Sequence, residues 1–135
     1  MSCIFCKIIS GEIPAKKIYE DDNFIAILDA FPSSAGHCLV IPKLHASDIL
    51  EMEEALAGQA FEVAAKIAKK MKAALCCDGV NILQNNCDAA GQTVHHFHVH
   101  VIPRYINDNI IIKWKSAPLN DNEAERVKVK LVPSD

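Results

Sequence analysis

Three histidines alternate with apolar residues near the middle of this 135-residue chain, at His96, His98 and His100. Because the side chains of a β-strand alternate between its two faces, the three imidazoles are expected on one face, roughly 6–7 Å apart. An imidazole can act as a nucleophile, a proton donor or a metal ligand. Three such groups on one face are costly to bury without a use, so we expect a functional site along the strand over 96–104.

The spacing of these histidines argues against one use, that of a zinc-dependent hydrolase in which all three hold the same ion. Zinc binds an imidazole nitrogen at about 2 Å. Three side chains spaced two residues apart along one strand cannot all converge on a single ion at that distance. A nucleophilic or proton-donating role is therefore the better interpretation.

Two cysteines near the N-terminus, Cys3 and Cys6, have the C-x₂-C spacing of half a zinc site. The alternative is a pair of buried thiols. The surrounding residues show no βαβ pattern, which argues against a thioredoxin-type redox pair. The other four cysteines have no such spacing and are predicted to be small core or surface residues; they are Cys38, Cys76, Cys77 and Cys87.

The pattern of apolar and turn residues predicts an α+β domain on a five-stranded antiparallel sheet, with one long and one short helix. A short helix over 4–9 precedes expected strands over 17–20, 24–29, 37–41 and 79–84, and the histidine strand is the fifth. Before the fourth strand, an amphipathic stripe that ends near Leu75 predicts the main helix. Ser47 or Asp48 is its expected N-cap, with Glu51 in capping-box spacing, and Gly58 is a candidate break. We expect one domain over 1–135, with a peripheral segment over 105–135.

The composition is that of an ordinary globular protein, with 50% apolar and 23% charged residues. A formal net charge of −3 gives no basic surplus, so we expect no nucleic-acid partner. The sequence shows no signal-peptide pattern and no apolar run long enough to span a membrane. We therefore expect a cytoplasmic protein with reduced cysteines and no membrane partner.

The sequence over 85–103 resembles the signature of the histidine triad (HIT) family of nucleotide-binding proteins. It reads Asn85, four residues, then AGQTVHHFHVHVIP, which ends at Pro103. Further matching blocks lie over 3–9, 12–14, 19–22 and 36–45, so the clear match runs over 3–104. The cysteine pair and the tail over 103–105 are more similar to the bacterial-type HIT hydrolases than to the animal Hint proteins.

The resemblance implies a homodimer whose two sheets join, a pocket for a purine nucleotide of the AMP or GMP type, and hydrolysis or transfer at the α-phosphorus. The family's nucleophile corresponds to His98, which would form a nucleotidyl-histidine intermediate. His100 and His37 correspond to the histidines that face the phosphate. Thr93 would hydrogen-bond on the side of the leaving group.

The resemblance also implies how the nucleotide is held. Gly91 and Gln92 would cradle the phosphate, Asn85 would contact the ribose or phosphate, and the Asp29 carboxylate would accept from the ribose hydroxyls. Apolar side chains would enclose the purine base; they are Ile4, Phe5, Ile8 and Ile27.

For the cysteine pair, the resemblance supplies two histidine partners. Family members with this pair hold a structural zinc ion with a Cys₂His₂ set, which here would be Cys3, Cys6, His45 and His96. Four protein ligands leave no position open for a reacting water. Trp114 lies beyond the clear match, where it is a candidate for packing at the dimer edge.

Two other functions stay open at this stage. A dinucleoside polyphosphate hydrolase would use the same chemistry but would need room for a second nucleotide. A nucleotide-binding regulatory protein with vestigial activity would not require a nucleophile, and the presence of His98 therefore favours an enzyme. The leading prediction is a hydrolase of nucleoside phosphoramidates or related nucleotides.

Overall fold

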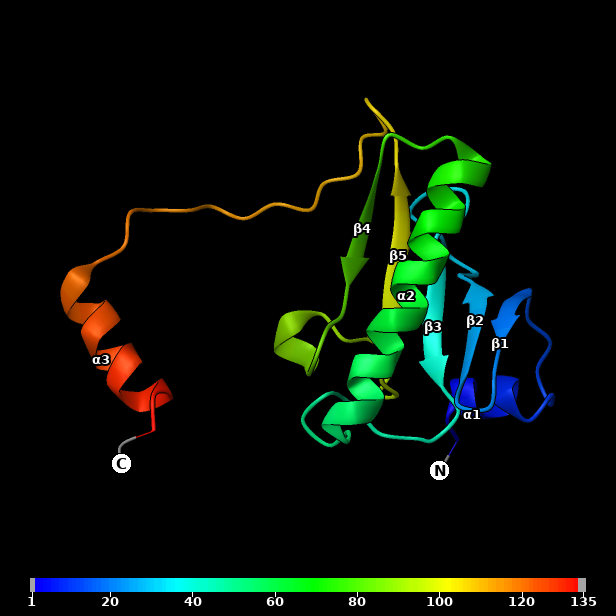
Figure 1. Cartoon of the computed structure of the whole chain (residues 1–135), viewed down its shortest axis with the longest axis horizontal. Coiled ribbons are helices and arrows are strands. Elements are labelled where there is room, and N and C mark those ends of the chain that lie inside the picture. Colours follow the sequence, from blue (N-terminus) through cyan, green and yellow to red (C-terminus); the bar gives the residue numbers. More distant parts are fainter. Residues whose placement is uncertain (1, 134–135) are drawn as a thin grey trace.

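A five-stranded antiparallel sheet with the strand order β1-β2-β3-β5-β4 forms the centre of the protein (Figure 1). The computed structural model describes residues 2–133. The strands are β1 (Lys17–Glu20), β2 (Phe24–Leu28), β3 (Cys38–Pro42), β4 (Gly79–Leu83) and β5 (Val99–Arg104). The helices are α1 (Ile4–Ile9), α2 (Glu54–Leu75) and α3 (Asp121–Leu131), with a 3₁₀ turn, η1, at Asp88–Ala90. The α+β class and the five-stranded antiparallel sheet are confirmed.

The two faces of the sheet are covered by different helices. The long helix α2 packs on one face, where Phe97, Val99 and Val101 are buried in the larger core. The short helix α1 lies against the other face (Figure 1), and its Phe5 joins a smaller core from β2 and β3. The alternation along the histidine segment therefore directs the apolar residues toward α2 and leaves the histidines on the α1 side.

The central strands fix the register of the histidines. β3 pairs with β5 so that Leu39 lies opposite His100, and β4 pairs with β5 on the other side so that Leu83 also lies opposite His100. His100 thus lies in the middle of the sheet, where hydrogen bonds on both sides hold its backbone. The position of its ring depends little on the loops.

The predicted start of the main helix was wrong. α2 begins at Glu54, and no side chain caps its first turn. Asp48 and Glu51 instead close the preceding loop, because their carboxylates accept from the backbone N–H groups of Leu50 and Ser47. Gly58 does not break the helix, since the apolar stripe packed on the sheet continues through it.

The histidine strand is shorter than predicted. Its ladder begins at Val99, because the backbone N–H of Phe97 donates to the carbonyl of Ala46 and not to a neighbouring strand. His96 and His98 therefore lie in an extended segment just before β5.

The third helix, α3, was not predicted. Its sequence is mostly polar, and the Asn120 side chain caps its start by accepting from the N–H of Glu123. In Figure 1 an extended segment carries α3 away from the sheet. Within residues 2–133, no helix is both long and apolar enough to cross a membrane.

Two glycines provide a test of the fold. Gly36 has a φ of +103°, and a Cβ there would lie 2.6 Å from Leu75 Cδ1 and 3.2 Å from Pro103 Cγ. Gly58 lies inside α2, and apart from its chain neighbours and the nearby backbone of that helix no atom lies within 4 Å of such a Cβ. We expect Gly36→Ala to lower the free energy of unfolding by about 1–3 kcal/mol and Gly58→Ala to raise it by about 0.5–1 kcal/mol, measured by urea denaturation. Equal effects would contradict this packing.

Candidate active site and metal-binding cluster

A cavity of about 980 Å³ opens on the α1 side of the sheet. Its volume is within the range of small-molecule sites. One part of its wall is apolar and comes from α1, β2 and β3, including all four residues predicted to hold a base: Ile4, Phe5, Ile8 and Ile27. The polar part includes Asp29, Thr93, His98 and His100. The cavity thus combines an apolar wall with a small set of polar groups.

His98 is held so that one ring nitrogen has a free lone pair. Its Nδ1 lies 2.7 Å from the carbonyl oxygen of His96. Because a carbonyl can only accept, Nδ1 carries the proton and donates, and Nε2 of the neutral ring keeps its lone pair. Burial lowers the pKa of His98, and the Phe5 ring packs edge-on at 5.1 Å between centroids. His98 is therefore neutral at pH 7 and oriented by a main-chain group.

His37 and His100 are hydrogen-bonded to each other, and a backbone group also sets the position of the proton on each ring. The N–H of Ser33 donates to Nδ1 of His37 at 3.0 Å, so His37 carries its own proton on Nε2. That Nε2 lies 2.9 Å from Nδ1 of His100 and donates to it. The proton of a neutral His100 is then on its Nε2. His98 and His100 thus hold opposite tautomers, with their ring centroids 5.0 Å apart.

His100 acts as an uncharged donor. Burial, followed by the neighbouring His98 and His37, lowers the pKa of His100 to about 4. Burial also lowers the pKa of His37. These shifts keep both rings neutral at pH 7, so His100 offers an N–H and not a full positive charge.

The remaining ring nitrogens are open to the cavity. Neither Nε2 of His98 nor Nε2 of His100 is hydrogen-bonded within residues 2–133. Among the same residues, no side-chain nitrogen or oxygen is buried without a partner. The lone pair of His98 and the N–H of His100 are therefore accessible from the same cavity.

Asp29 lies beside the hydrogen-bonded pair His37 and His100. Its Oδ2 is 3.4 Å from Nε2 of His37, and its Oδ1 accepts from the N–H of Phe31 at 2.9 Å. Asp29, His37 and His100 are also close enough together to hold a metal ion. However, the Ser33 N–H occupies the second nitrogen of His37, which keeps a proton on the nitrogen that such an ion would need. The hydrogen-bonded chain is therefore the better description of the three residues.

The loop before the histidines is held mainly by its own contacts. Gln92 is buried, and its amide nitrogen donates to the carbonyls of Ser47 and Val94 while its oxygen accepts from the N–H of Cys87. Of the residues of this loop predicted to contact the nucleotide or its leaving group, the structure brings Thr93 to the cavity wall. It leaves Asn85, Gly91 and Gln92 outside that wall. Gln92 is occupied with fixing the loop that presents Thr93.

Sequence reasoning missed several residues that shape the cavity. Leu39 lines it beside His100, and the strand register explains why. Phe31 lies at the wall but is 92% exposed. Ser33 acts through its main-chain N–H, for which the residue type gives no signal. Leu39 belongs to the third predicted strand, 37–41, and only the pairing of that strand with the histidine strand could have placed it at the site.

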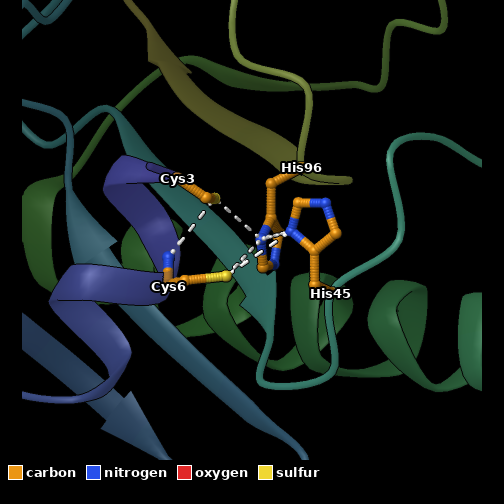
Figure 2. Close-up of side chains that lie close together, drawn as sticks. All are labelled: Cys3, Cys6, His45 and His96. Atoms are coloured by element: carbon orange, nitrogen blue, oxygen red, sulfur yellow. Dashed lines mark hydrogen bonds between the residues drawn. The ribbon is translucent and has the colours of Figure 1, made fainter. Parts of the chain in front are cut away.

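The second cluster consists of Cys3, Cys6, His45 and His96, whose side chains point toward one another (Figure 2). Nδ1 of His96 lies 3.4 Å from Sγ of Cys3 and 3.6 Å from Sγ of Cys6. His45 Nδ1 lies 3.5 Å from Sγ of Cys6 and 3.0 Å from Nδ1 of His96.

These distances fit a tetrahedral metal site. Zinc–sulfur and zinc–nitrogen bonds of about 2.3 and 2.0–2.1 Å would place the two kinds of ligand roughly 3.5 Å apart. Nε2 of His96 donates to the carbonyl of Pro42 at 2.8 Å, which leaves the lone pair of Nδ1 directed at the cluster. The donor set, two thiols and two imidazoles, is one that zinc prefers.

The fold and the histidine-lined cavity together define a class of protein, and comparison with known proteins identifies it. The HIT domain family model matches residues 10–107, and the chain belongs to this family. It is 45% identical to protein hit of Bacillus subtilis over 116 residues, which are 85% of this chain and 80% of that protein.

Two relatives have names that state an activity. The chain is 39% identical to the adenosine 5′-monophosphoramidase hnt1 of Schizosaccharomyces pombe, over 91% of this chain and 90% of that protein. It is 42% identical to the adenylylsulfatase HINT3 of Arabidopsis thaliana, over 87% of this chain but only 58% of that protein.

Similar solved structures support the same family assignment. A HIT family protein from Bacillus subtilis aligns over 100% of both chains, with a TM-score of 0.87 and 38% identity. A zinc-bound histidine triad family protein from Mycobacterium smegmatis aligns over 93% of this chain and 89% of that chain, with a TM-score of 0.80 and 41% identity.

The assignment of the ring protons can be tested directly. We expect nitrogen-15 NMR spectra at pH 7 to show His98 protonated at Nδ1, and His37 and His100 protonated at Nε2, because main-chain groups fix each ring. The exposed His95 provides an internal reference for a ring without a buried main-chain partner. An Nε2-protonated His98 would show that its lone pair is not available to the cavity.

Proposed function

We propose that this protein hydrolyses purine nucleotides at the α-phosphorus, acting on nucleoside phosphoramidates or related adenylyl compounds through a nucleotidyl intermediate on His98. The neutral His98, with a free Nε2 lone pair in the wall of a nucleotide-sized cavity, is the observation that carries the proposal. The names of the Arabidopsis thaliana and Schizosaccharomyces pombe relatives both refer to adenylyl compounds but with different leaving groups. This supports the nucleotide as the recognised part.

The proposed reaction has two displacements at phosphorus. In the first, Nε2 of His98 attacks, a phosphorus–nitrogen bond forms, and the leaving group departs with its bonding electron pair and takes up a proton from water. In the second, water attacks the phosphorus, gives its proton to solvent, and releases the nucleoside monophosphate as the bond to His98 breaks. While the phosphorus is bound, the ring is positively charged, and the carbonyl of His96 stabilises it through Nδ1.

The other residues would act by hydrogen bonding. The N–H of His100 would donate to a phosphoryl oxygen as negative charge develops there, with its proton position held by His37. The carboxylate of Asp29 would accept from the ribose hydroxyls, and the apolar wall from α1 and β2 would enclose the base. Thr93 would hydrogen-bond near the leaving group.

We also propose that the Cys3, Cys6, His45 and His96 cluster holds a zinc ion. The ligand distances and the donor set fit zinc, and the Mycobacterium smegmatis relative is described as zinc-bound. Four protein ligands would leave no open coordination position, so the role of the ion would be structural. Reduced thiols at this cluster favour the cytoplasm as the compartment.

A homodimer is the proposed assembly. β4 is an edge strand of the sheet, and its Ile82 is exposed. An open edge of this kind favours pairing with a second copy, which would join the two sheets.

Replacing His98 tests the proposed nucleophile. Asparagine keeps a polar group but has no nucleophilic nitrogen, so His98→Asn is expected to lower kcat by several orders of magnitude on an adenosine phosphoramidate, with nucleotide binding largely retained. His100→Ala is expected to cost about 10²–10³-fold, because it removes one stabilising donor. His95→Asn, at an exposed histidine outside the cavity, is the matched control. If His98→Asn kept a tenth of the wild-type turnover, His98 would not be the nucleophile.

Metal analysis tests the cluster. Protein purified without chelator is expected to contain close to one zinc ion per chain, and Cys3→Ser is expected to lower both the zinc content and the melting temperature. Cys76→Ser, at an exposed cysteine outside the cluster, is the control and should change neither. Zinc-free protein of unchanged stability would contradict a structural metal.

A further inference from the structure

Phe31 is the most exposed large apolar side chain within residues 2–133, with 92% of its surface accessible, yet it belongs to the cavity wall. The other phenylalanine of that wall, Phe5, is buried, and so are Ile27 and Leu39. A residue that lines a cavity and also faces solvent lies at the opening of that cavity. The proposed reaction assigns no role to Phe31.

The backbone at Phe31 is held in place, so the exposure of the ring does not come from a loose loop. The N–H of Phe31 donates to Oδ1 of Asp29 at 2.9 Å. Pro32 follows, and a proline restricts the residue before it to extended backbone conformations. The phenyl ring therefore projects into solvent from a fixed support.

The rest of the loop between β2 and β3 is closed by its own hydrogen bonds. The N–H of Asp29 donates to the carbonyl of His37 at 2.9 Å, and the N–H of His37 donates to the carbonyl of Ser34 at 3.0 Å. The hydroxyl of Ser34 donates to the carbonyl of Pro103 in β5 at 2.7 Å. These contacts join the loop to the strand that carries His100. The backbone of the loop therefore keeps its place relative to the histidines.

A phenyl ring held at the opening of an apolar cavity is suited to a flat, apolar group that enters from solvent. Water covers the ring in the free protein, and its release on contact favours binding. Aromatic side chains hold nucleic-acid bases in this way, because every base has a π face. The apolar wall from α1 and β2 is proposed to enclose the inner side of the base, which leaves the outer side for Phe31.

The order of residues along the chain indicates which part of a nucleotide Phe31 meets. Ile27 belongs to the wall proposed to hold the base, and Asp29 is proposed to bind the ribose. Phe31 follows two residues later and is hydrogen-bonded to Asp29. Thr93, which is proposed to lie near the leaving group, comes from a different loop before β5. Phe31 therefore belongs to the nucleoside side of the cavity.

We propose that the ring of Phe31 packs against the solvent-facing side of the bound base and sets the affinity of the site for the nucleoside. The inference rests on the proposed function, because it takes the bound molecule to be a purine nucleotide. The phenyl ring has no polar atom with which to stabilise charge at phosphorus. Its contact with the base is therefore the same before and during the reaction, and its loss raises KM without lowering kcat.

Substitutions of Phe31 in the full-length chain test this contact. Phe31→Ala removes the ring and Phe31→Trp keeps an aromatic face, whereas Leu50→Ala removes an exposed apolar side chain outside the cavity and is the control. Calorimetry measures the dissociation constant of AMP, and competition measures the inhibition constant of ribose 5-phosphate, which lacks the base. Steady-state kinetics on an adenosine phosphoramidate give kcat and KM. Thermal melting checks that each variant is folded.

We expect Phe31→Ala to raise the dissociation constant of AMP by about tenfold or more, as the loss of a base–aromatic contact typically does. Its KM should rise to a similar extent, with kcat within about threefold of the wild-type value. Phe31→Trp and Leu50→Ala should bind AMP within about threefold of wild type. Ribose 5-phosphate should inhibit the wild type and Phe31→Ala equally.

Unchanged AMP binding by Phe31→Ala would overturn the inference and leave the proposed function intact, provided that the wild type binds AMP and turns over the phosphoramidate. A raised KM with unchanged AMP binding would overturn it as well, because the ring would then contact the leaving group. An equal loss of ribose 5-phosphate binding would show that Phe31 does not act on the base. A wild type that neither binds AMP nor turns over the phosphoramidate would overturn the proposed function and, with it, this contact.

Discussion

The hydrogen bond from Nδ1 of His98 to the carbonyl oxygen of His96 is the contact on which the candidate active site depends. It decides which nitrogen of His98 holds the lone pair. The same residue, His96, has its ring in the cysteine–histidine cluster and donates through Nε2 to the carbonyl of Pro42. Because both nitrogens of the His96 ring are committed, its peptide group has little freedom to turn. One residue thus joins the cysteine–histidine cluster to the proposed nucleophile.

The three histidines of the candidate site have different tasks because different backbone groups face them. A carbonyl next to His98 makes Nδ1 a donor, whereas the N–H of Ser33 next to His37 makes Nδ1 an acceptor. Because His37 is then protonated at Nε2, it donates to Nδ1 of His100, and the proton of His100 is on Nε2. Burial then keeps the rings uncharged by lowering their pKa values. A base with a free lone pair and a neutral donor can therefore lie 5.0 Å apart between ring centroids without repelling each other.

Residue type and spacing were enough to predict the face that the histidines share, the five-stranded antiparallel sheet and the grouping of the two cysteines near the N-terminus. They were not enough to predict which ring nitrogen of each histidine carries the proton, because main-chain atoms determine this. The Ser33 N–H, the His96 carbonyl and the Pro42 carbonyl would be present with almost any side chain. The start of α2 was missed for a related reason. The carboxylates of Asp48 and Glu51 can accept hydrogen bonds from the backbone N–H groups of a loop as well as from those of a helix start. The helix α3 was missed because its apolar face is short and lies in a mostly polar segment.

The wall of the cavity depends on the cluster through α1. This helix has six residues, which is too few to be stable by itself, yet it supplies Ile4, Phe5 and Ile8 to the cavity. Besides its packing on β2 and β3, two further contacts hold it in place. Cys3 and Cys6 join its first turn to His45 and His96, and Phe5 packs edge-on against both His96 and His98. Whatever loosens the cluster would therefore release the wall proposed to hold the base and, through His96, the carbonyl that orients His98.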